Sequence, residues 1–503
     1  MIFNSITFLC IFLPVMLAGF YLLPRKAVNI WLLLGSLFFY AWGGPKHLIF
    51  LLASIIGNFV FGIIIARLAT EEVPCDERGN NTVHSSAQKA VLALAVLLNL
   101  GSLVYFKYIG MLFETARDLF GKQLVIPEVI LPLGISFYTF QCMSYLIDVY
   151  RAEGAKIGEN TVNTIVTTNP IEFALFVTFF PQLLQGPIIR FSDVTDTLRN
   201  PKNVSFDDLV KGVGRFIVGL SKKVLIANTI GEVADNIFAG NYEYMSTSVA
   251  WLGAILYTLQ IYFDFAGYSD MAIGLGKMFG FKIRENFDYP YISKSVTEFW
   301  RRWHITLSNW FRDYLYIPLG GNRKGNVYFN LLIVFLATGI WHGAAWGFLV
   351  WGLWHGLFML IERALKGKRI GFSLPAGLGG FLKWLYTILV VTLGWVLFKI
   401  EDLPEALSYI GVMFHTKSHS YNAFSLRYFL DGRLLFFLII AVIACIPWAQ
   451  VLPRHIAAYI ADFVGGSGKA ARTVRYICLI VLMILCFVFV VNNTYSPFIY
   501  FQF

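Results

Sequence analysis

Apolar runs close to the length of a bilayer span recur from one end of this chain to the other. A helix needs about 20 apolar residues to cross the hydrocarbon core. The candidate runs are 6–23, 30–42, 48–65, 90–105, 130–149, 171–184, 213–230, 249–265, 331–361, 382–398, 434–449 and 477–491. They predict an all-α polytopic membrane protein of about ten to thirteen transmembrane or re-entrant helices. We expect residues 1–503 to form one integral membrane domain.

Composition and charge agree with a membrane protein. Of the 503 residues, 57% are hydrophobic and 14% are charged, whereas about 25% are charged in an ordinary soluble domain. The net charge is +10, but lysine and arginine lie mostly between the apolar runs, where they set topology and meet anionic headgroups. Membrane lipids are therefore expected partners, and nucleic acid is not.

The distribution of basic residues predicts the orientation. Arg25 and Lys26 follow the first apolar run, and no small-residue cleavage site accompanies it, so a cleaved leader is not expected. The positive-inside rule places this loop in the cytoplasm and the N-terminus outside. The later loops alternate in charge in the same way: the stretch 363–369 is basic, the stretch 401–405 is acidic, and Arg472 and Arg475 are basic again. Both termini are therefore predicted to be extracytoplasmic.

Several common kinds of site are not indicated. The six cysteines form no Cys-x-x-Cys pair, and no histidine or carboxylate cluster has metal-ligand spacing, so neither a metal nor a disulfide framework is expected. The polar loop 401–433 contains His415 and His419, but nothing in it demands chemistry. No Gly-x-Ser-x-Gly elbow or Walker loop is present.

Polar residues at membrane depth concentrate between residues 249 and 362. Asp264 lies toward the end of an apolar run, where a carboxylate costs about 2.5 to 3.5 kcal/mol on insertion scales unless it is satisfied. We therefore expect it to have a partner. Either an ion pair or backbone cap joins two spans through it, or it serves a polar cavity.

A second group of polar residues follows. Ser295 and Glu298 have the capping-box spacing that opens a helix. Aromatic and apolar residues then recur every three or four positions, which predicts an amphipathic interfacial or re-entrant helix. Its apolar side contains Trp300, Trp303, Leu307, Trp310 and Tyr314, and its polar side contains Arg301, Arg302, Ser308, Asn309 and Arg312. His304 borders the apolar stripe and is either structural or functional, and the preceding arginines suit an anionic pantetheine phosphate or CoA.

The run 331–361 contains no charged residue and would be about 46 Å long as one helix, too long for one perpendicular span. Its glycines predict tight helix packing or a break. His342 lies well inside it, where a buried neutral imidazole can act as a general base, although a hydrogen-bonded structural role is the alternative. His355 lies about 20 Å further along a continuous helix, so it cannot share a site with His342 unless the chain breaks between them.

These strings together resemble the membrane-bound O-acyltransferase family. The resemblance rests on Tyr262–Asp270, Glu298–Ser308, Trp310–Asn322 and Trp341–Gly343, with further likeness at 180–190 and 3–14. The ending 497–503 and the length are more similar to the alginate O-acetylase branch than to the shorter D-alanyl-lipoteichoic acid transferases. Peptidoglycan O-acetyltransferases belong to the same bacterial branch.

The resemblance implies helices around a narrow tunnel, with the catalytic core at about 130–365. It implies His342 and His304 as catalytic residues, with His342 deprotonating the acceptor hydroxyl. His304 would orient the thioester or stabilise charge on its carbonyl oxygen. Acyl-donor or tunnel contacts are assigned to Arg302, Trp303, Asn309 and Trp341. An acyl-histidine intermediate remains an equal alternative.

The implied function is O-acyl transfer at the bacterial cytoplasmic membrane. An acyl group, foremost acetyl, would pass from a cytoplasmic thioester, acetyl-CoA or an acyl carrier, to an exported polysaccharide such as alginate. An extracytoplasmic acetyltransferase partner would complete the transfer, and no permanently bound cofactor is expected. Alternatives are D-alanyl transfer to teichoic acid and O-acetylation of peptidoglycan or cellulose. A polysaccharide or lipid transporter is the alternative of another class, but it would more often show two related halves. A non-catalytic membrane scaffold would not need His342 at membrane depth.

Overall fold

A computed structural model describes residues 1–68, 84–121, 127, 129–152, 165–202, 204–366, 375–415, 424–448, 469–492 and 495. His419 and the ending 497–503, both named in the sequence analysis, lie outside these ranges. The chain divides into two compact units. Unit 1 comprises Met1–Val213 and Ala272–Arg284, and unit 2 comprises Gly214–Met271 and Glu285–Phe503. The prediction of a single domain stays a prediction.

Within the described ranges the regular structure is helical. Six helices are long and apolar enough to cross a membrane, and shorter apolar helices accompany them. They confirm the predicted polytopic all-α membrane protein. Unit 1 begins with six elements: η1 (Phe8–Phe12), α1 (Leu13–Leu22), α2 (Arg25–Ala41), α3 (Pro45–Arg67), α4 (Ser86–Leu103) and η2 (Val104–Tyr108). Unit 1 continues with α5 (Ile109–Phe120), α6 (Ile135–Arg151), α7 (Pro170–Thr178) and α8 (Phe191–Arg199).

Unit 2 contains the candidate site, and the following elements lie in it. They are η3 (Lys222–Ala227), α10 (Asn228–Phe238), η4 (Tyr242–Tyr244), η5 (Pro290–Ile292), α12 (Val296–Arg302), α13 (Ile305–Phe311), η6 (Arg312–Tyr316), α14 (Val327–His342), α15 (Trp346–Leu365), α16 (Ala376–Lys399), α17 (Leu403–Phe414), α18 (Leu426–Phe429), α19 (Gly432–Ala444) and α22 (Lys469–Asn492). The division between the units falls inside α9 (Phe206–Ser221) and α11 (Thr247–Met278).

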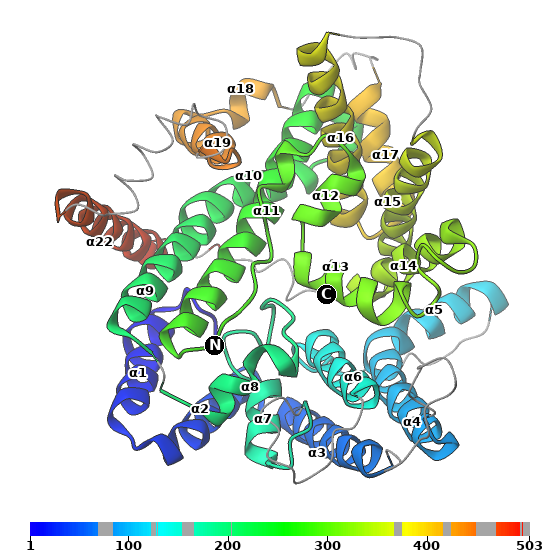
Figure 1. The fold of residues 1–503 in the computed structure, drawn as a ribbon. Coiled ribbons are helices and arrows are strands. Elements are labelled where there is room, and N and C mark those ends of the chain that lie inside the picture. Colours follow the sequence, from blue (N-terminus) through cyan, green and yellow to red (C-terminus); the bar gives the residue numbers. More distant parts are fainter. Residues whose placement is uncertain are drawn as a thin grey trace. The chain divides into compact units, whose positions relative to one another are not determined.

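Unit 1 is organised around α6, whose residues are buried almost without interruption from Ile135 to Leu146. Helices α3 and α4 pack against α6, as Figure 1 shows. Where α3 meets α4, the side chains of Asn58 and Asn99 exchange two hydrogen bonds, of 3.2 and 2.7 Å. This exchange satisfies two amides that would otherwise be costly in an apolar helix pair.

One predicted span in unit 1 is shorter than expected. The run 171–184 forms a helix only as far as Thr178, and turns follow. Pro181 has no backbone N–H and disfavours helical geometry at the residue before it, so the helix cannot continue. A contact with α2 holds this turn, because the Phe180 backbone N–H donates to Ser36 Oγ at 3.1 Å.

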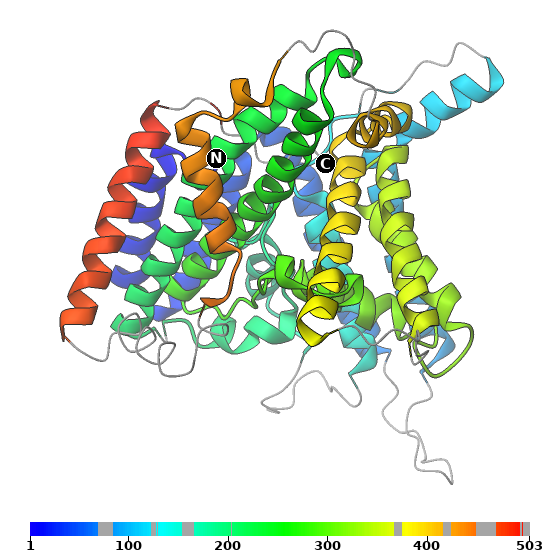
Figure 2. The same cartoon turned by 90° about the horizontal axis from the view of Figure 1, so that it is seen from above.

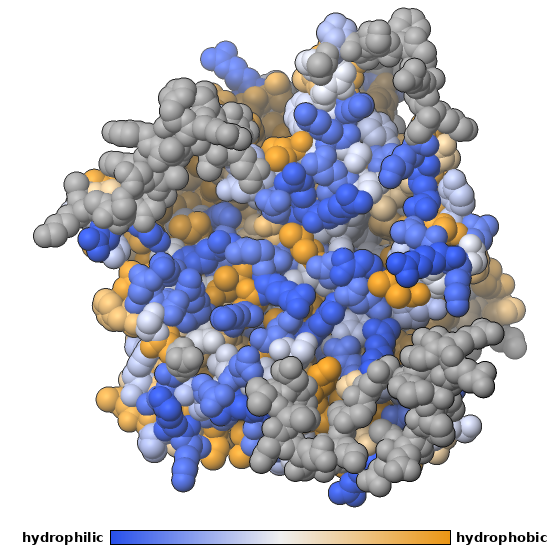
Figure 3. All heavy atoms as spheres, in the orientation of Figure 1, coloured by the Kyte–Doolittle hydropathy of each residue, from blue (hydrophilic) through white to orange (hydrophobic). Residues whose placement is uncertain are grey.

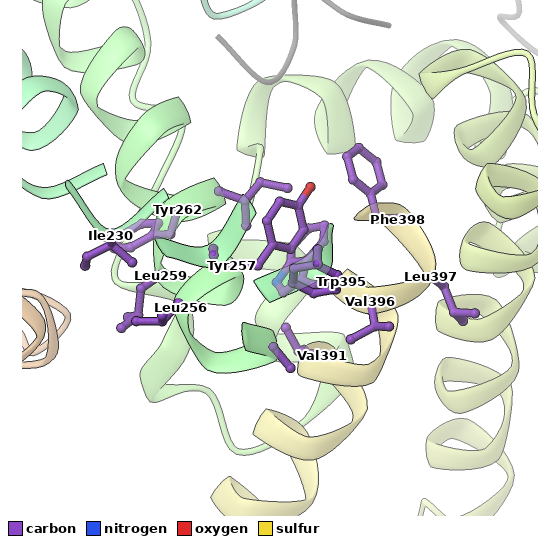
Figure 4. Packing of buried hydrophobic residues seen from close by; sticks show 14 of the residues in the cluster. Ile230, Leu256, Tyr257, Leu259, Tyr262, Val391, Trp395, Val396, Leu397 and Phe398 are labelled. Carbon is purple, nitrogen blue, oxygen red and sulfur yellow. The ribbon is translucent and has the colours of Figure 1, made fainter. Parts of the chain in front are cut away.

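Unit 2 is organised around α11, which extends well beyond the predicted run 249–265. Its apolar residues surround the axis, and 89% of its most apolar window is buried, against 6% for α22. An all-round apolar helix of this kind belongs in an interior. Tyr257 on α11 and Trp395 on α16 point into the space between the two helices (Figure 4). Helices α15 and α16 run side by side in Figure 2.

Candidate active site

The long apolar run 331–361 breaks directly after His342. Helix α14 ends there, and Gly343 and Ala345 are extended before α15 begins at Trp346. Helix α15 folds back against α14, and a Cβ on Gly339 would lie only 2.5 Å from the Phe348 carbonyl oxygen. The run therefore contains both features that its glycines predicted, a break and close helix packing.

His342 is 3% exposed and surrounded by aromatic rings. Its ring centroid lies 4.8 Å from that of Trp351, 4.9 Å from that of Trp341 and 5.3 Å from that of Phe398. All three rings stand nearly perpendicular to the imidazole. The aromatic contacts fix the plane of His342 at the end of α14.

The predicted helix after Ser295 is interrupted at His304, so the expectation of one continuous amphipathic helix was wrong. Helix α12 ends at Arg302, Trp303 is extended, and His304 is left-handed with φ 43° before α13 begins. The chain leaves the helix here because it pairs with another segment: Asp288 N donates to Arg302 O, and Ile305 N donates to Asn286 O, each at 2.9 Å. Left-handed backbone at a non-glycine residue costs about 1 to 2 kcal/mol.

The predicted start and apolar stripe of this segment are present. Ser295 Oγ accepts the Glu298 backbone N–H at 3.0 Å, but the Glu298 carboxylate accepts from Lys294 N instead of closing the capping box. Glu362 on α15 accepts the backbone N–H groups of Val296 and Thr297. The stripe residues are all buried: Trp300, Trp303, Leu307, Trp310 and Tyr314.

Asn286 determines the tautomer of His304. The Thr306 backbone N–H and hydroxyl meet Asn286 Oδ1 at 3.1 and 2.8 Å. A backbone N–H can only donate, so this atom of Asn286 is the acceptor oxygen. His304 Nδ1, also 3.1 Å from it, must therefore be the protonated ring nitrogen. The other nitrogen, Nε2, has no hydrogen-bond partner within the described ranges.

Burial keeps His304 in its neutral form. Its side chain is 1% exposed, and desolvation lowers the pKa of His304 to about 3. In the neutral tautomer set by Asn286, the Nε2 lone pair is free to accept a hydrogen bond or a proton. This nitrogen accepts and does not donate.

Trp341 connects the two histidines within unit 2. Its ring centroid lies 6.1 Å from that of His304 and 4.9 Å from that of His342. His304 and His342 are separated in sequence by α13, η6 and most of α14, and both lie against the indole of Trp341. The sequence-predicted pair and Trp341 form one cluster.

The remaining predicted contacts separate into three environments. Arg302 is engaged by two carboxylates, at 3.1 Å from Glu298 and 2.9 Å from Asp288. Trp303 is 1% exposed and packs against Trp395 at 4.7 Å between ring centroids. Asn309 lines an adjacent cavity.

This cavity, of about 580 Å³, lies among α12, α13, η6, α14 and α15. Its polar lining includes Arg301, Arg312, Arg363, Asn309 and Asn322, and Trp300, Phe335 and Thr338 form part of its apolar wall. Figure 3 shows that the face of unit 2 over α12 and α13 is largely hydrophilic. The positive charge of the three arginines suits a phosphate-bearing ligand.

Two residues of the candidate site were not predicted from sequence. Arg363 was used only to predict topology, and it lines the cavity because α15 ends beside η6 and α12. Asn286 was given no role from sequence. A backbone turn that pairs residues 286–288 with 302–305 gives no periodic signal, so its contact with His304 could not be found by pattern.

The predicted partner of Asp264 is Lys223 on η3. Lys223 Nζ lies 2.6 Å from Asp264 Oδ1, and the two side chains are 1% and 5% exposed. Asp264 therefore forms a buried ion pair, which is the first of the two roles expected from sequence. The described residues contain no group of three or more histidine, cysteine or carboxylate side chains that could hold a metal.

Comparison with known proteins decides the family. The model of the MBOAT, membrane-bound O-acyltransferase, family matches residues 90–369, which contain both histidines. The chain belongs to this family. It is therefore an O-acyltransferase, and it is a multi-pass membrane protein.

The most informative relatives fall into three groups by name. The chain is 40% identical over 519 residues to a probable alginate O-acetylase of Pseudomonas putida, and the match covers 100% of both chains. It is 36% identical over 438 residues to a peptidoglycan O-acetyltransferase of Helicobacter pylori, covering 82% of this chain and 80% of the relative. It is 30% identical to a teichoic acid D-alanyltransferase of Streptococcus thermophilus over 47% of this chain and 58% of the relative.

Proposed function

We propose that this O-acyltransferase moves acetyl groups from cytoplasmic acetyl-CoA toward an exported polysaccharide of the alginate class. The observation that supports it best is the cluster of His304, Trp341 and His342, two buried histidines on one indole beside an arginine-lined cavity. The full-length similarity to a probable alginate O-acetylase supports the acceptor class. The cytoplasmic membrane, with both termini outside, is the proposed location.

His342 is proposed as the general base. It takes the proton of the acceptor hydroxyl as the oxygen attacks the thioester carbonyl. The carbon–oxygen bond then forms, the carbon–sulfur bond breaks, and the proton passes to the departing thiolate, so that ester and thiol are the products. General base catalysis contributes about 100-fold to 10,000-fold in rate. Attack by His342 itself, with an acyl-imidazole intermediate, uses the same atoms in two steps.

The arginine-lined cavity is proposed as the entry site of the donor. Arg363 begins the basic stretch 363–369, which the positive-inside rule assigns to the cytoplasm. Arg301, Arg312 and Arg363 would meet the phosphates of CoA, and Asn309 and Asn322 supply amide groups for hydrogen bonds. Trp300 in the wall connects this cavity to the buried aromatic core around the histidines.

The tautomer of His304 gives it a narrower role than the sequence suggested. With Nδ1 donating to Asn286, Nε2 presents a lone pair, which cannot stabilise an oxyanion. We therefore assign His304 to orientation, accepting a hydrogen bond from an N–H or O–H group of a bound substrate. Trp341 holds His304 and His342 at a fixed separation.

The test is transfer of radiolabelled acetyl from acetyl-CoA to oligosaccharide by purified protein in lipid. We expect His342→Ala to lose at least about 100-fold in kcat, while the control substitution Lys277→Met, at a partly exposed surface residue, leaves kcat unchanged. Full transfer by folded His342→Ala would overturn the assignment. Transfer that requires a D-alanyl carrier thioester instead of acetyl-CoA would overturn the donor.

Peptidoglycan is the second candidate acceptor, supported by the similarity to the Helicobacter pylori enzyme over most of both chains. Parallel assays with alginate and peptidoglycan fragments decide between them. An extracytoplasmic acetyltransferase partner is proposed to complete transfer onto the polymer. Its addition is expected to raise polymer acetylation without changing the rate at which the chain consumes acetyl-CoA in the first turnover.

A further inference from the structure

A third histidine, His355, lies in the interior of unit 2. The break after His342 and the return of α15 place it among aromatic rings. Its ring centroid is 5.2 Å from that of Trp300, 5.4 Å from that of Trp351 and 6.3 Å from that of Phe299. The side chain is 0% exposed.

Histidine is a destabilising residue in this buried aromatic pocket. Neither of its ring nitrogens has a hydrogen-bond partner within the described ranges. A buried polar group without a partner destabilises the folded protein. Phenylalanine or leucine would fill an aromatic pocket without this cost.

A second destabilising residue, a glycine on the facing helix, leaves the space that the imidazole occupies. Gly394 lies on the facing helix α16, and a Cβ at this position would stand 2.6 Å from His355 Nε2. Glycine within a helix is destabilising relative to alanine. The chain thus accepts two destabilising residues, one on each helix, to keep an imidazole at this point.

Trp351 links this imidazole to the proposed base. Its indole lies 4.8 Å from the His342 ring at 88° and 5.4 Å from the His355 ring at 75°. These are edge-to-face arrangements, in which the edge of one ring meets the face of the other. The two histidines therefore hold the same indole.

We propose that His355 is a positioning residue that fixes Trp351 and, through it, the orientation of His342. It touches neither donor nor acceptor, and it acts by keeping the Trp351 indole in the position from which that ring holds the base. This role rests on the proposed function of His342. The two can fail separately, because the orientation of His342 has readouts that do not need turnover.

The principal variant is His355→Phe, which keeps an aromatic ring and removes both nitrogens. We expect kcat to fall about tenfold, the KM for acetyl-CoA to change less than about twofold, and the thermal midpoint to stay or rise, because the unpaired polar group is gone. In a Trp351→Phe background, His355→Phe should change kcat less than about twofold, because the indole through which His355 acts on His342 is no longer present. Unchanged kcat, or an equal loss in both backgrounds, would overturn the proposal.

A second variant avoids changing the histidine. The methyl group of Gly394→Ala would displace the imidazole, and we expect the same loss of kcat. Gly377→Ala on the same helix is the matched control, because nothing lies within 4 Å of a Cβ there. If Gly394→Ala and Gly377→Ala have equal kcat, the proposal is wrong.

NMR of isotope-labelled histidine gives the readout without turnover. His355→Phe should shift the imidazole signals of His342, identified by their absence in His342→Ala, and should leave those of His304 in place. Unmoved His342 signals overturn the positioning role even if acyl transfer is intact. If wild-type protein transfers nothing from any thioester, the proposed function fails, and these signals still decide whether His355 positions His342.

Discussion

The buried ion pair between Lys223 and Asp264 provides a demanding test of the fold of unit 2. With the two atoms 2.6 Å apart and the side chains 1% and 5% exposed, neither charge can reach solvent when its partner is removed. Breaking such a pair by truncating one member costs about 3 to 5 kcal/mol, because the other charge stays buried. Lys223→Met therefore should lower the free energy of unfolding by about this amount.

The double variant separates the charge effect from packing. Lys223→Met combined with Asp264→Leu removes both buried charges, and replacement of a buried pair by apolar residues is neutral or stabilising in comparable cases. We expect it to unfold close to the wild type. The exposed pair of Lys277 and Asp208, 3.9 Å apart and about half exposed, supplies the control, and Lys277→Met should cost less than about 1 kcal/mol.

The assay is thermal unfolding of purified protein in one detergent, followed by the intrinsic fluorescence of tryptophan. At about 2 °C per kcal/mol, Lys223→Met should lower the midpoint by about 6 °C or more, with little change in the double variant and in Lys277→Met. A Lys223→Met midpoint equal to that of the wild type would refute the buried pair. A double variant as unstable as the single one would assign the loss to packing.

Three further outcomes follow from the site. Arg312→Ala should raise the KM for acetyl-CoA about tenfold or more with kcat nearly unchanged, since a charge-assisted hydrogen bond contributes about 1.5 to 3 kcal/mol; steady-state kinetics measure both. Glu362→Gln should lower the thermal midpoint because it weakens the acceptor of the Thr297 hydroxyl and of two backbone N–H groups at the start of α12, and an unchanged midpoint contradicts that contact. Burial lowers the pKa of His304 to about 3 in the folded protein, so the contribution of this residue to stability is complete above about pH 6.5 and is lost as the pH falls toward 3. Through His304, the free energy of unfolding should be about 1.4 kcal/mol smaller at about pH 5.5 than at neutral pH. His304→Gln should abolish that part of the pH dependence.

The spans could be predicted from sequence because lipid imposes a length and a composition on every crossing helix. The partner requirement of Asp264 was also predictable, since an unpaired carboxylate at that depth is costly. The identity of the partner was not, because Lys223 lies on a different helix and only packing brings η3 against α11.

The break near His342 was predicted as one of two alternatives, and the interruption at His304 was missed. A helix break at glycine has a local signal. The interruption at His304 depends on hydrogen bonds from residues 286–288, and on a left-handed residue that is not glycine, so the local amphipathic pattern continues straight through it. The tautomer of His304 follows from the same long-range contact and has no trace in the sequence around it.

The shortness of α14 bears on how this protein enters the membrane. Its 16 residues reach about 24 Å, against about 30 Å for the hydrocarbon core. Alone in lipid, the carbonyl groups of its last turn would face hydrocarbon without partners. We therefore expect helices α14 and α15 to insert as a single hairpin, closed where Gly352 on α15 approaches Gly339 on α14 so closely that a Cβ on Gly352 would lie 3.1 Å from the Gly339 Cα. Substitutions in that contact should reduce the amount of inserted protein before they change its rate.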